Sequence, residues 1–283
     1  MVDSSLIQST LNPMPSWKQK SVLITGGSAG LGVAIARRFA AEGASVAIVG
    51  RDPSRLSSAA AQLNEPGRPP ILALTADLTR QSQVQDALKE ATEAHGGLDL
   101  LVNCAGRSCR GAIESTTAEQ FQELLEINFL AAVRCTQAAL PQLLARRGHV
   151  VFIGSLASKV ASRYLGAYPA SKFPLTAYAQ QLRLELGPQG LHTLLVCPGP
   201  LRRDDAGQRY EAAADGLPSS AKQPGGGAKL RGIDPDDLAQ RIARACERRQ
   251  SELIVPASAK LLFAISQLWP GLGDRLLLCM TGG

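Results

Sequence analysis

Short runs of apolar and β-branched residues alternate along this chain with stretches of helical periodicity, and this alternation restricts the possible folds more than any other feature. Helical periodicity and few breakers mark six stretches, at residues 29–42, 53–63, 81–95, 118–146, 165–186 and 234–248. Seven runs resemble buried strands, at residues 21–25, 45–49, 71–75, 98–103, 149–154, 191–197 and 252–255. We therefore predict an α/β fold of the Rossmann type, a doubly wound and mainly seven-stranded parallel sheet with helices on both faces.

The domain organisation follows from the length of the alternating region. The chain has 283 residues, of which 45% are hydrophobic, enough for one large α/β domain. We expect an N-terminal tail at 1–17, a single domain at 18–256 and an apolar extension at 257–283. Within the domain, residues 200–232 contain three prolines and a run of three glycines, which predicts a long irregular connection with one short helix near 209–215.

Composition and charge exclude several classes of protein. The 30 basic and 24 acidic residues are interspersed, so the net charge of +6 does not indicate nucleic-acid binding. The six cysteines form no Cys-x-x-Cys pair, which favours reduced thiols and a cytoplasmic location. His95, His149 and His192 lack metal-ligand spacing, so no metal is expected. No stretch has the length of a signal peptide or a membrane span, and we expect a soluble chain.

A glycine-rich turn follows the first predicted strand, and it reads Thr25-Gly26-Gly27-Ser28-Ala29-Gly30-Leu31-Gly32. Glycines let a backbone turn sharply and approach a pyrophosphate, whose charge the N-terminus of the next helix then stabilises. The alternative is a turn that uses glycine only for the backbone conformation between a strand and a helix. Its place after the first strand of an alternating chain favours dinucleotide binding.

Four polar residues add a possible catalytic group. Tyr168 and Lys172 are four residues apart, which puts them on one face of a helix. Ser155 follows the fifth strand, where ligands bind in such sheets, and Asn128 stands among apolar residues of the preceding helix. Together with the glycine-rich turn, this order and spacing resembles the Asn-Ser-Tyr-Lys tetrad of the short-chain dehydrogenase/reductase family.

The resemblance spans residues 18–256 and implies a single catalytic domain. The length, prolines and glycines of 200–232 predict that this segment is a mobile substrate lid. Tyr168 would be the general acid and base in hydride transfer between a nicotinamide and a carbonyl or secondary alcohol. Lys172 and the positive nicotinamide would lower its pKa, and Ser155 would donate to the reacting oxygen. In the family, the tyrosine and lysine also contact the cofactor, and Asn128 would fix a water on the proton path from Lys172.

The end of the second strand predicts NADP(H) in preference to NAD(H). Gly50 stands where NAD-binding proteins place a carboxylate for the ribose, and Arg51 and Arg55 follow it, which favours a 2′-phosphate. Asp52 is the competing candidate. An aspartate before Pro53 is typical of a helix cap, and we prefer that interpretation.

Further cofactor contacts are implied by the resemblance alone. Asp77 and Leu78 would hold the adenine, although Asp77 is also suited to cap the next helix. The nicotinamide side would be formed by Asn103, Ala105, Gly106, Pro198 and Gly199. Two departures from the family pattern stand out: Cys104 replaces an asparagine, and no threonine follows Pro198-Gly199 to hold the carboxamide, a task that falls to the backbone near Leu201. Pro174 predicts a kink close to Lys172.

The sequence thus predicts an NADP(H)-dependent oxidoreductase acting on a ketone or 3-oxoacyl substrate, and the alternative is an inactive dinucleotide-binding sensor or scaffold. Leu156, Val160 and Leu165 favour a substrate with an apolar part. We expect a homodimer or homotetramer. Residues 259–280 are apolar around most of a helix, which predicts burial on the pocket or in an interface, with peripheral membrane contact as the alternative. Arg107, Arg110, Arg202 and Arg203 are interpreted as solvated surface rather than as a site for an anionic substrate.

Overall fold

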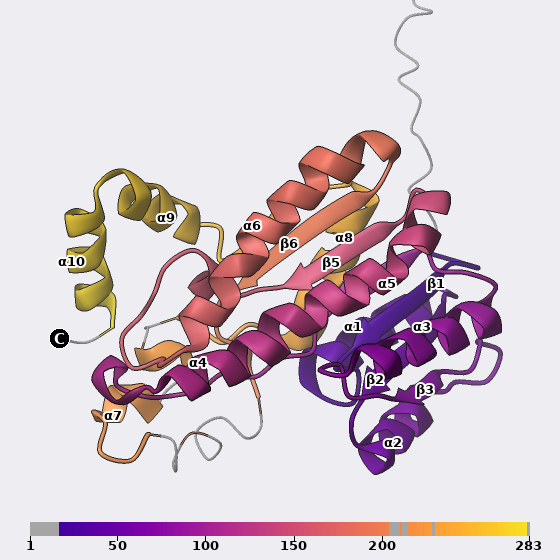
Figure 1. The fold of residues 1–283 in the computed structure, drawn as a ribbon, viewed down its shortest axis with the longest axis horizontal. Coiled ribbons are helices and arrows are strands. Elements are labelled where there is room, and N and C mark those ends of the chain that lie inside the picture. The colour runs from indigo at the N-terminus through magenta and orange to yellow at the C-terminus, as the bar shows by residue number, and fades with distance from the viewer. Residues whose placement is uncertain (1–16, 204–209, 211–213, 223, 228–229, 282–283) are drawn as a thin grey trace, which may run out of the picture.

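The computed structural model describes residues 17–203, 210, 214–222, 224–227 and 230–281 (Figure 1). The expected N-terminal tail, apart from Trp17, lies outside the described residues, as does much of the short helix expected near 209–215. Within the described residues all seven predicted strands and six helical stretches are present, with small shifts at their ends.

The sheet is fully parallel and has the order β3-β2-β1-β4-β5-β6-β7. Its order reverses between β1 and β4, so the loops that follow these two strands open a crevice at the carboxyl edge. The fold-class prediction is confirmed. The strands are β1 (Ser21–Thr25), β2 (Ser45–Gly50), β3 (Leu72–Thr75), β4 (Leu100–Asn103), β5 (His149–Ile153), β6 (His192–Pro198) and β7 (Glu252–Val255).

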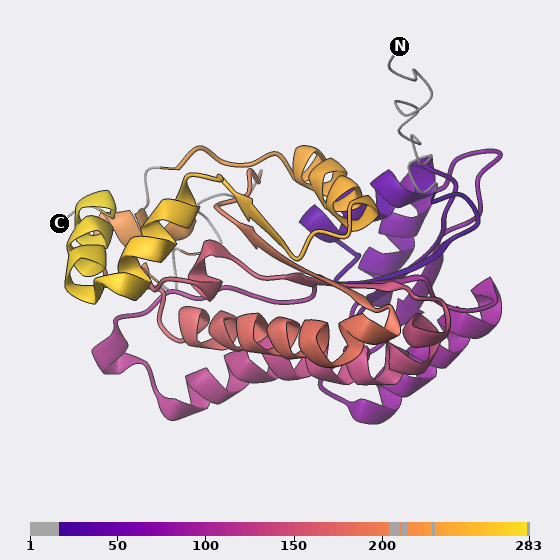
Figure 2. The same ribbon diagram turned by 90° about the horizontal axis from the view of Figure 1, so that it is seen from above.

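Helices cover both faces of the sheet, which Figure 2 shows as two layers with the strands between them. One face carries α1 (Gly30–Ala41), α2 (Pro53–Leu63) and α8 (Pro235–Glu247), whose apolar side chains share a core with β1 and β2. The other face carries α3 (Gln81–His95), α4 (Ala118–Leu125), α5 (Ala131–Ala145) and α6 (Tyr168–Leu186).

Local signals in the sequence explain why several helices begin where they do. Asp52 accepts a hydrogen bond of 3.0 Å from the Arg55 amide, and Pro53 occupies the first turn of α2. This confirms Asp52 as a helix cap. Asp234 caps α8 in the same way, through the Asp236 amide at 2.9 Å.

Two helix predictions need correction. Residues 118–146 do not form one regular helix, because a π-helical turn at Glu126–Leu130 separates α4 from α5. The wider turn carries the buried Asn128, and such turns are frequent at functional sites. The helix expected from residue 165 begins at Tyr168, because Leu165 pairs with Gly111 and Gly166 adopts a φ of +48°.

The described part of 200–232 is more regular than its prolines and glycines predict. It contains α7 (Ser219–Lys222) and a 3₁₀ turn at Pro224–Gly227. Ala214 and Ala221 are fully buried. Packing of these two alanines therefore holds the segment against the domain despite its prolines and glycines.

The C-terminal extension forms α9 (Ala259–Leu268) and α10 (Pro270–Met280) at one end of the molecule (Figures 1 and 2). Within this chain the two helices bury only Ala259, Phe263 and Gly273. The expected burial of this extension on the pocket or in an interface therefore stays a prediction. The helices pack mainly on each other, so their large apolar side chains remain outside. Among the described residues, no helix is long and apolar enough to cross a membrane.

Candidate active site

The four residues of the predicted tetrad meet at the carboxyl edge of the sheet. Ser155 follows β5, Tyr168 and Lys172 lie on the first turns of α6, and Asn128 comes from the π-helical turn before α5. Gly106, in the loop after β4, lies between two of them: a Cβ added there would lie 2.6 Å from Asn128 Oδ1 and 3.3 Å from Lys172 Nζ. This close approach explains a glycine at position 106.

Asn128 is held rigidly. Its Oδ1 accepts from the Arg107 amide at 2.8 Å, and its Nδ2 donates to the Arg107 carbonyl at 2.9 Å. The same Nδ2 donates to Ser171 Oγ at 2.8 Å, and that hydroxyl donates to the Tyr168 carbonyl at 2.7 Å. Asn128 thereby connects the loop after β4 to the start of α6.

Tyr168 and Ser155 are coupled through their hydroxyl groups. Burial raises the pKa of Tyr168 to about 12, and its hydrogen bond with Ser155 opposes that rise. Ser155 is itself positioned by the short turn after β5, since its Oγ accepts from the Ala157 amide at 3.1 Å. Among the protein's own groups, burial therefore keeps Tyr168 a neutral phenol. The predicted lowering of its pKa by the positive nicotinamide stays a prediction.

Lys172 is buried and donates to the Ile153 carbonyl at 2.9 Å. Burial lowers the pKa of its ammonium to about 8, and the neighbouring Cys104 and Cys197 oppose that shift. A buried lysine with a lowered pKa beside a phenol is an arrangement suited to proton transfer near neutral pH.

The glycine-rich turn forms a cradle that a dinucleotide pyrophosphate fits. Gly26 and Gly30 have φ angles of +69° and +54°, and a Cβ on Gly32 would lie 2.2 Å from the Gly26 carbonyl oxygen. The residue before α1 is Ala29, which gives the helix no side-chain cap, so the first amides of α1 are available to an anion. Ser28, Leu31 and the rest of the predicted loop lie in this turn.

Thr25 and Asn103 end the two strands that flank the crevice. Thr25 Oγ1 accepts from the amides of Cys104 and Ala105, at 3.0 and 3.1 Å, so it fixes the loop after β4. Asn103 Nδ2 donates to Thr136 Oγ1 at 3.1 Å. Its Oδ1 is buried and has no hydrogen-bond partner among the described residues, an exception that calls for an explanation at a site of this kind.

The predicted adenosine side lies at the ends of β2 and β3. A Cβ on Gly50 would lie 3.4 Å from Ser28 Oγ, while Arg51 and Arg55 are exposed beside it. Asp77 does not cap α3, whose first turn follows Arg80; its carboxylate accepts from Thr79 instead. That hydrogen bond, with help from the charges of Arg51 and Arg80, lowers the pKa of Asp77.

At the nicotinamide side, the loops after β4 and β6 carry the remaining predicted residues. Ala105 is fixed by Thr25. Leu78, which was predicted for the adenine side, is buried after β3. Pro198 ends β6, and Gly199 donates to the Val255 carbonyl at 2.7 Å. The backbone at Leu201 pairs with Ile233.

The interpretation of Arg110 as solvated surface was wrong. Arg110 is only 8% exposed, donates to the Ala221 carbonyl at 2.6 Å and stacks over the Tyr210 ring at 3.8 Å. The Tyr210 hydroxyl is also 2.8 Å from Ser108 Oγ, so these contacts hold the 200–232 segment against the loop after β4. No local pattern in the sequence pairs these positions, because they are a hundred residues apart.

Arg203 is exposed but lies over the glycine-rich turn, with its Nη2 at 3.6 Å from a Cβ added to Gly30. The positive charge of Arg203 was the only feature of the sequence that could have indicated this position. By contrast, Arg107 and Arg202 form exposed ion pairs with Glu123 and Asp234, as expected of surface residues.

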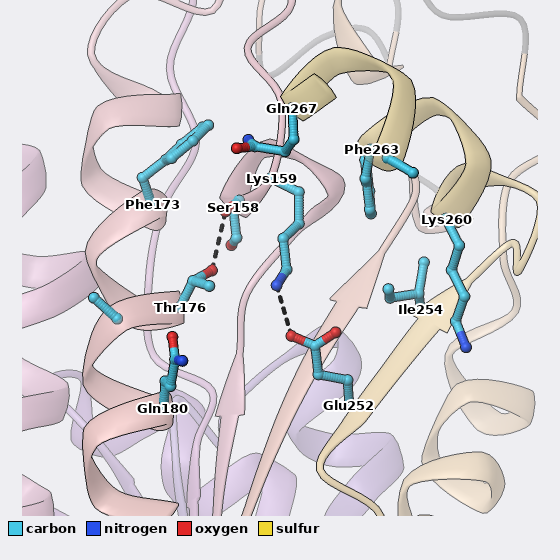
Figure 3. A pocket seen from close by; sticks show the side chains of 12 residues that line it. Ser158, Lys159, Phe173, Thr176, Gln180, Glu252, Ile254, Lys260, Phe263 and Gln267 are labelled. Atoms are coloured by element: carbon cyan, nitrogen blue, oxygen red, sulfur yellow. Dashed lines mark hydrogen bonds and ion pairs between the residues drawn. The ribbon is translucent and has the colours of Figure 1, made fainter. Parts of the chain in front are cut away.

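A groove of about 670 Å³ lies between α6, β7 and α9 (Figure 3). Phe173 and Phe263 face each other across it, and at its floor Lys159 pairs with Glu252 at 2.6 Å. Tyr168 and Lys172 do not line this groove. It is therefore separate from the tetrad.

Folding brings together residues that the sequence suggested were isolated. At the amino edge of the sheet His149 Nδ1 lies 2.9 Å from His192 Nδ1, and Cys246 lies beside them. Burial lowers the pKa of His149 to about 3 and that of His192 to about 4. His192 Nε2 is 2.8 Å from the Gln250 carbonyl, so this neutral pair satisfies its own hydrogen bonds.

Comparison with known proteins identifies the family. The sequence model described as short chain dehydrogenase matches residues 20–213. The chain belongs to the short-chain dehydrogenase family. It is 33% identical over 274 residues to dehydrogenase/reductase SDR family member 7B of Danio rerio, covering 94% of this chain and 87% of that one. It is 31% identical over 265 residues to the ketoacyl reductase HetN of Nostoc, with coverages of 91% and 88%.

A solved structure agrees with this assignment. A short-chain dehydrogenase from Burkholderia cenocepacia, crystallised in complex with NADP, superposes with a TM-score of 0.73 at 32% sequence identity. The match covers 87% of this chain and all of that one. This member of the short-chain dehydrogenase family is thus an NAD(P)-dependent oxidoreductase with a Rossmann-type sheet.

Proposed function

We propose that this enzyme transfers hydride between NADP(H) and a carbonyl or secondary alcohol, with Tyr168 as general acid and base. The observation that carries the proposal is the convergence of Tyr168, Ser155, Lys172 and Asn128 beside a pyrophosphate cradle at the switch point of the sheet. In this family a nicotinamide dinucleotide, when bound, supplies or accepts the hydride.

The residues of the chain divide the remaining work. In the reductive direction Tyr168 gives its phenolic proton to the developing alkoxide, and Ser155 donates a hydrogen bond to the same oxygen. A phenol whose pKa burial raises to about 12 holds its proton well and is a poor base. The reverse reaction therefore needs nearby positive charge. The charge of Arg110 lowers the pKa of Tyr168, and the Lys172 ammonium would add to it.

Lys172 and Asn128 complete the proton path. The Lys172 ammonium, whose pKa burial lowers to about 8, is suited to release and recover a proton near neutral pH. The Oδ1 and Nδ2 atoms of Asn128 are both engaged in hydrogen bonds, with Arg107 and Ser171. We therefore assign Asn128 a positioning role, in which it fixes α6 against the loop after β4. Asn103 Oδ1 and the ammonium of Lys172 are the groups that would hold the nicotinamide ribose.

The proposed preference for NADP(H) rests on charge. Position 50 is glycine, so no carboxylate is present to accept from the ribose or to repel a 2′-phosphate, and Arg51 and Arg55 are exposed beside it. Charge-assisted hydrogen bonds from guanidinium groups suit a phosphate. The NADP held by the Burkholderia relative supports the same choice.

Arg203 extends the phosphate site beyond the glycine-rich turn. Its guanidinium lies over Gly30, where a pyrophosphate bound at the start of α1 would meet it. The substrate would then enter between the loop after β4 and the 200–232 segment, which Arg110 and Tyr210 hold together. A carbonyl compound with an apolar part, such as a ketone or 3-oxoacyl ester, fits the apolar Leu156, Val160 and Leu165.

The test is a panel of ketones and 3-oxoacyl esters offered with NADPH or NADH that carries two deuterium atoms at nicotinamide C4. We expect at least one carbonyl to yield an alcohol one mass unit heavier, with faster turnover from NADPH than from NADH. Tight NADPH binding with no label in any product would instead support the inactive sensor or scaffold.

A further inference from the structure

The α9–α10 hairpin leaves several large apolar side chains exposed, and its two helices approach closely at a glycine. Gly273 of α10 is buried against α9, where an added Cβ would lie 2.5 Å from Ser266 Oγ. Six large apolar residues remain exposed on the hairpin: Leu261, Leu268, Trp269, Leu272, Leu278 and Met280. Exposed apolar residues gathered on one short segment mark a surface that meets a partner or a membrane.

The hairpin is attached to the domain by few residues. Ala259 and Phe263 of α9 are buried against the core, and Leu277 of α10 packs beside them. The hairpin lies at the end of the molecule that follows the carboxyl end of β7 (Figures 1 and 2). It therefore lies at the sheet edge that also carries Ser155 and Tyr168.

Charge and aromatic placement favour a lipid surface over another protein. Within 259–280 the charged residues are Lys260, Asp274 and Arg275, all of them exposed, which gives the hairpin a charge of +1 on a chain of net charge +6. Trp269 stands at the junction of the two helices and is 60% exposed. Tryptophan beside basic residues is characteristic of segments that lie at the boundary between headgroups and acyl chains.

We propose that the α9–α10 hairpin docks this enzyme on the surface of an anionic bilayer. Trp269 and the exposed leucines enter the headgroup boundary, and Lys260 and Arg275 contact lipid phosphates. The hairpin lies on the surface and does not span it, since α9 and α10 have 10 and 11 residues. Docking at the sheet edge of the tetrad would bring apolar substrates near the cleft.

Vesicle binding by the full chain tests this directly and needs no substrate. We expect the protein to co-sediment with vesicles of phosphatidylcholine mixed with phosphatidylglycerol, and to bind phosphatidylcholine alone more weakly. The chain has two tryptophans, and Trp17 is only 4% exposed, so a blue shift of emission on binding reports Trp269. Protein that stays in the supernatant with unshifted emission would overturn the proposal.

Matched variants separate the hairpin from general stickiness. L268Q/L272Q should weaken vesicle binding at least about tenfold, because two apolar side chains leave the boundary. L184Q is the control, since Leu184 is 69% exposed on α6 and Leu268 is 67% exposed on α9. Equal loss in both variants would contradict specific docking by the hairpin.

A charge pair and the oligomeric state complete the test. R275Q should lower binding to the mixed vesicles about fivefold, the effect of one basic residue near an anionic surface. K89Q, at an exposed position on α3, should leave binding unchanged. Light scattering gives the particle mass of the wild type and of L268Q/L272Q. If the variant has half the mass of the wild type and neither protein binds vesicles, the hairpin contacts a second copy of the chain and the proposal fails.

Discussion

The two edges of the sheet both contain buried ionisable groups, yet they differ in how those groups are used. At the amino edge Asp99 accepts from Lys20, Arg146 and the Ser21 amide, and His149 and His192 bond to each other. At the carboxyl edge Asn103 Oδ1 has no partner among the described residues, and α1 begins without a side-chain cap.

The difference shows that burial and a shifted pKa do not by themselves make a site. Burial opposes ionisation of Asp99, but its hydrogen bonds and cationic neighbours outweigh it and lower the pKa, so the group stabilises the fold. The pKa values of Tyr168 and Lys172 are also shifted, but these residues lie at the edge where Asn103 Oδ1 has no partner among the described residues. We therefore expect variants at the carboxyl edge to change chemistry and variants at the amino edge to change stability.

The largest effect is expected from Lys172→Met. Turnover should fall about 10²-fold to 10⁴-fold, because the proton path is lost. The dissociation constant for NADPH should rise about tenfold, because a charge-assisted hydrogen bond to the ribose is lost. The free energy of unfolding should not fall, since the fold no longer buries an ammonium whose pKa is lowered to about 8. Steady-state rates, NADPH titration and denaturant unfolding measure the three quantities; a large stability loss would give Lys172 a structural role like that of Asp99.

Ser155→Ala should lower kcat about a hundredfold while the dissociation constant for NADPH stays unchanged, because one hydrogen bond to the developing alkoxide is removed. Ser158→Ala is a comparison, since Ser158 Oγ accepts from the Ser155 amide and lines the separate groove. Its kcat should change much less. Equal losses of kcat in the two variants would mean that the turn, not the Ser155 hydroxyl, matters.

Arg51→Asp should weaken NADPH binding about tenfold to a hundredfold and improve the use of NADH, because a charge-assisted contact with the 2′-phosphate becomes a repulsion. Fluorescence titration with both cofactors measures it. Lys89→Asp introduces the same charge change on exposed α3 and should affect neither affinity. Tighter binding of NADH than NADPH by the wild type would contradict the assignment.

The smallest effect concerns pH and the amino edge. The pKa values of His149 and His192 are lowered to about 3 and about 4, so the folded protein keeps both neutral where the unfolded chain takes up protons below about 6.5. Stability should therefore decline as pH falls from 6.5 towards 4, by about 2 kcal/mol per histidine at pH 5. His149→Gln should make this decline shallower without changing kcat at pH 7. Unfolding curves at several pH values test it; an unchanged slope would argue against neutral histidines.

Much of the fold and of the site could be predicted from the sequence because its signals are local. The glycine-rich turn, the Asp52-Pro53 cap and the spacing of Tyr168 and Lys172 each act within one element. What the sequence did not predict depends on distant contacts. The π-helical turn at Asn128 depends on the backbone of Arg107, and the burial of Arg110 depends on Ala221. The proximity of His149 and His192 results from strand register.

The most direct test of the account compares Tyr168→Phe with the wild type, measuring the NADPH dissociation constant and the turnover of any accepted carbonyl on the same preparations. The phenyl ring keeps the packing, and only the proton-bearing oxygen is lost. We predict a dissociation constant within about twofold of the wild type and turnover reduced at least about a thousandfold. A variant that binds NADPH normally and retains wild-type turnover would contradict the assignment of Tyr168 as the general acid and base.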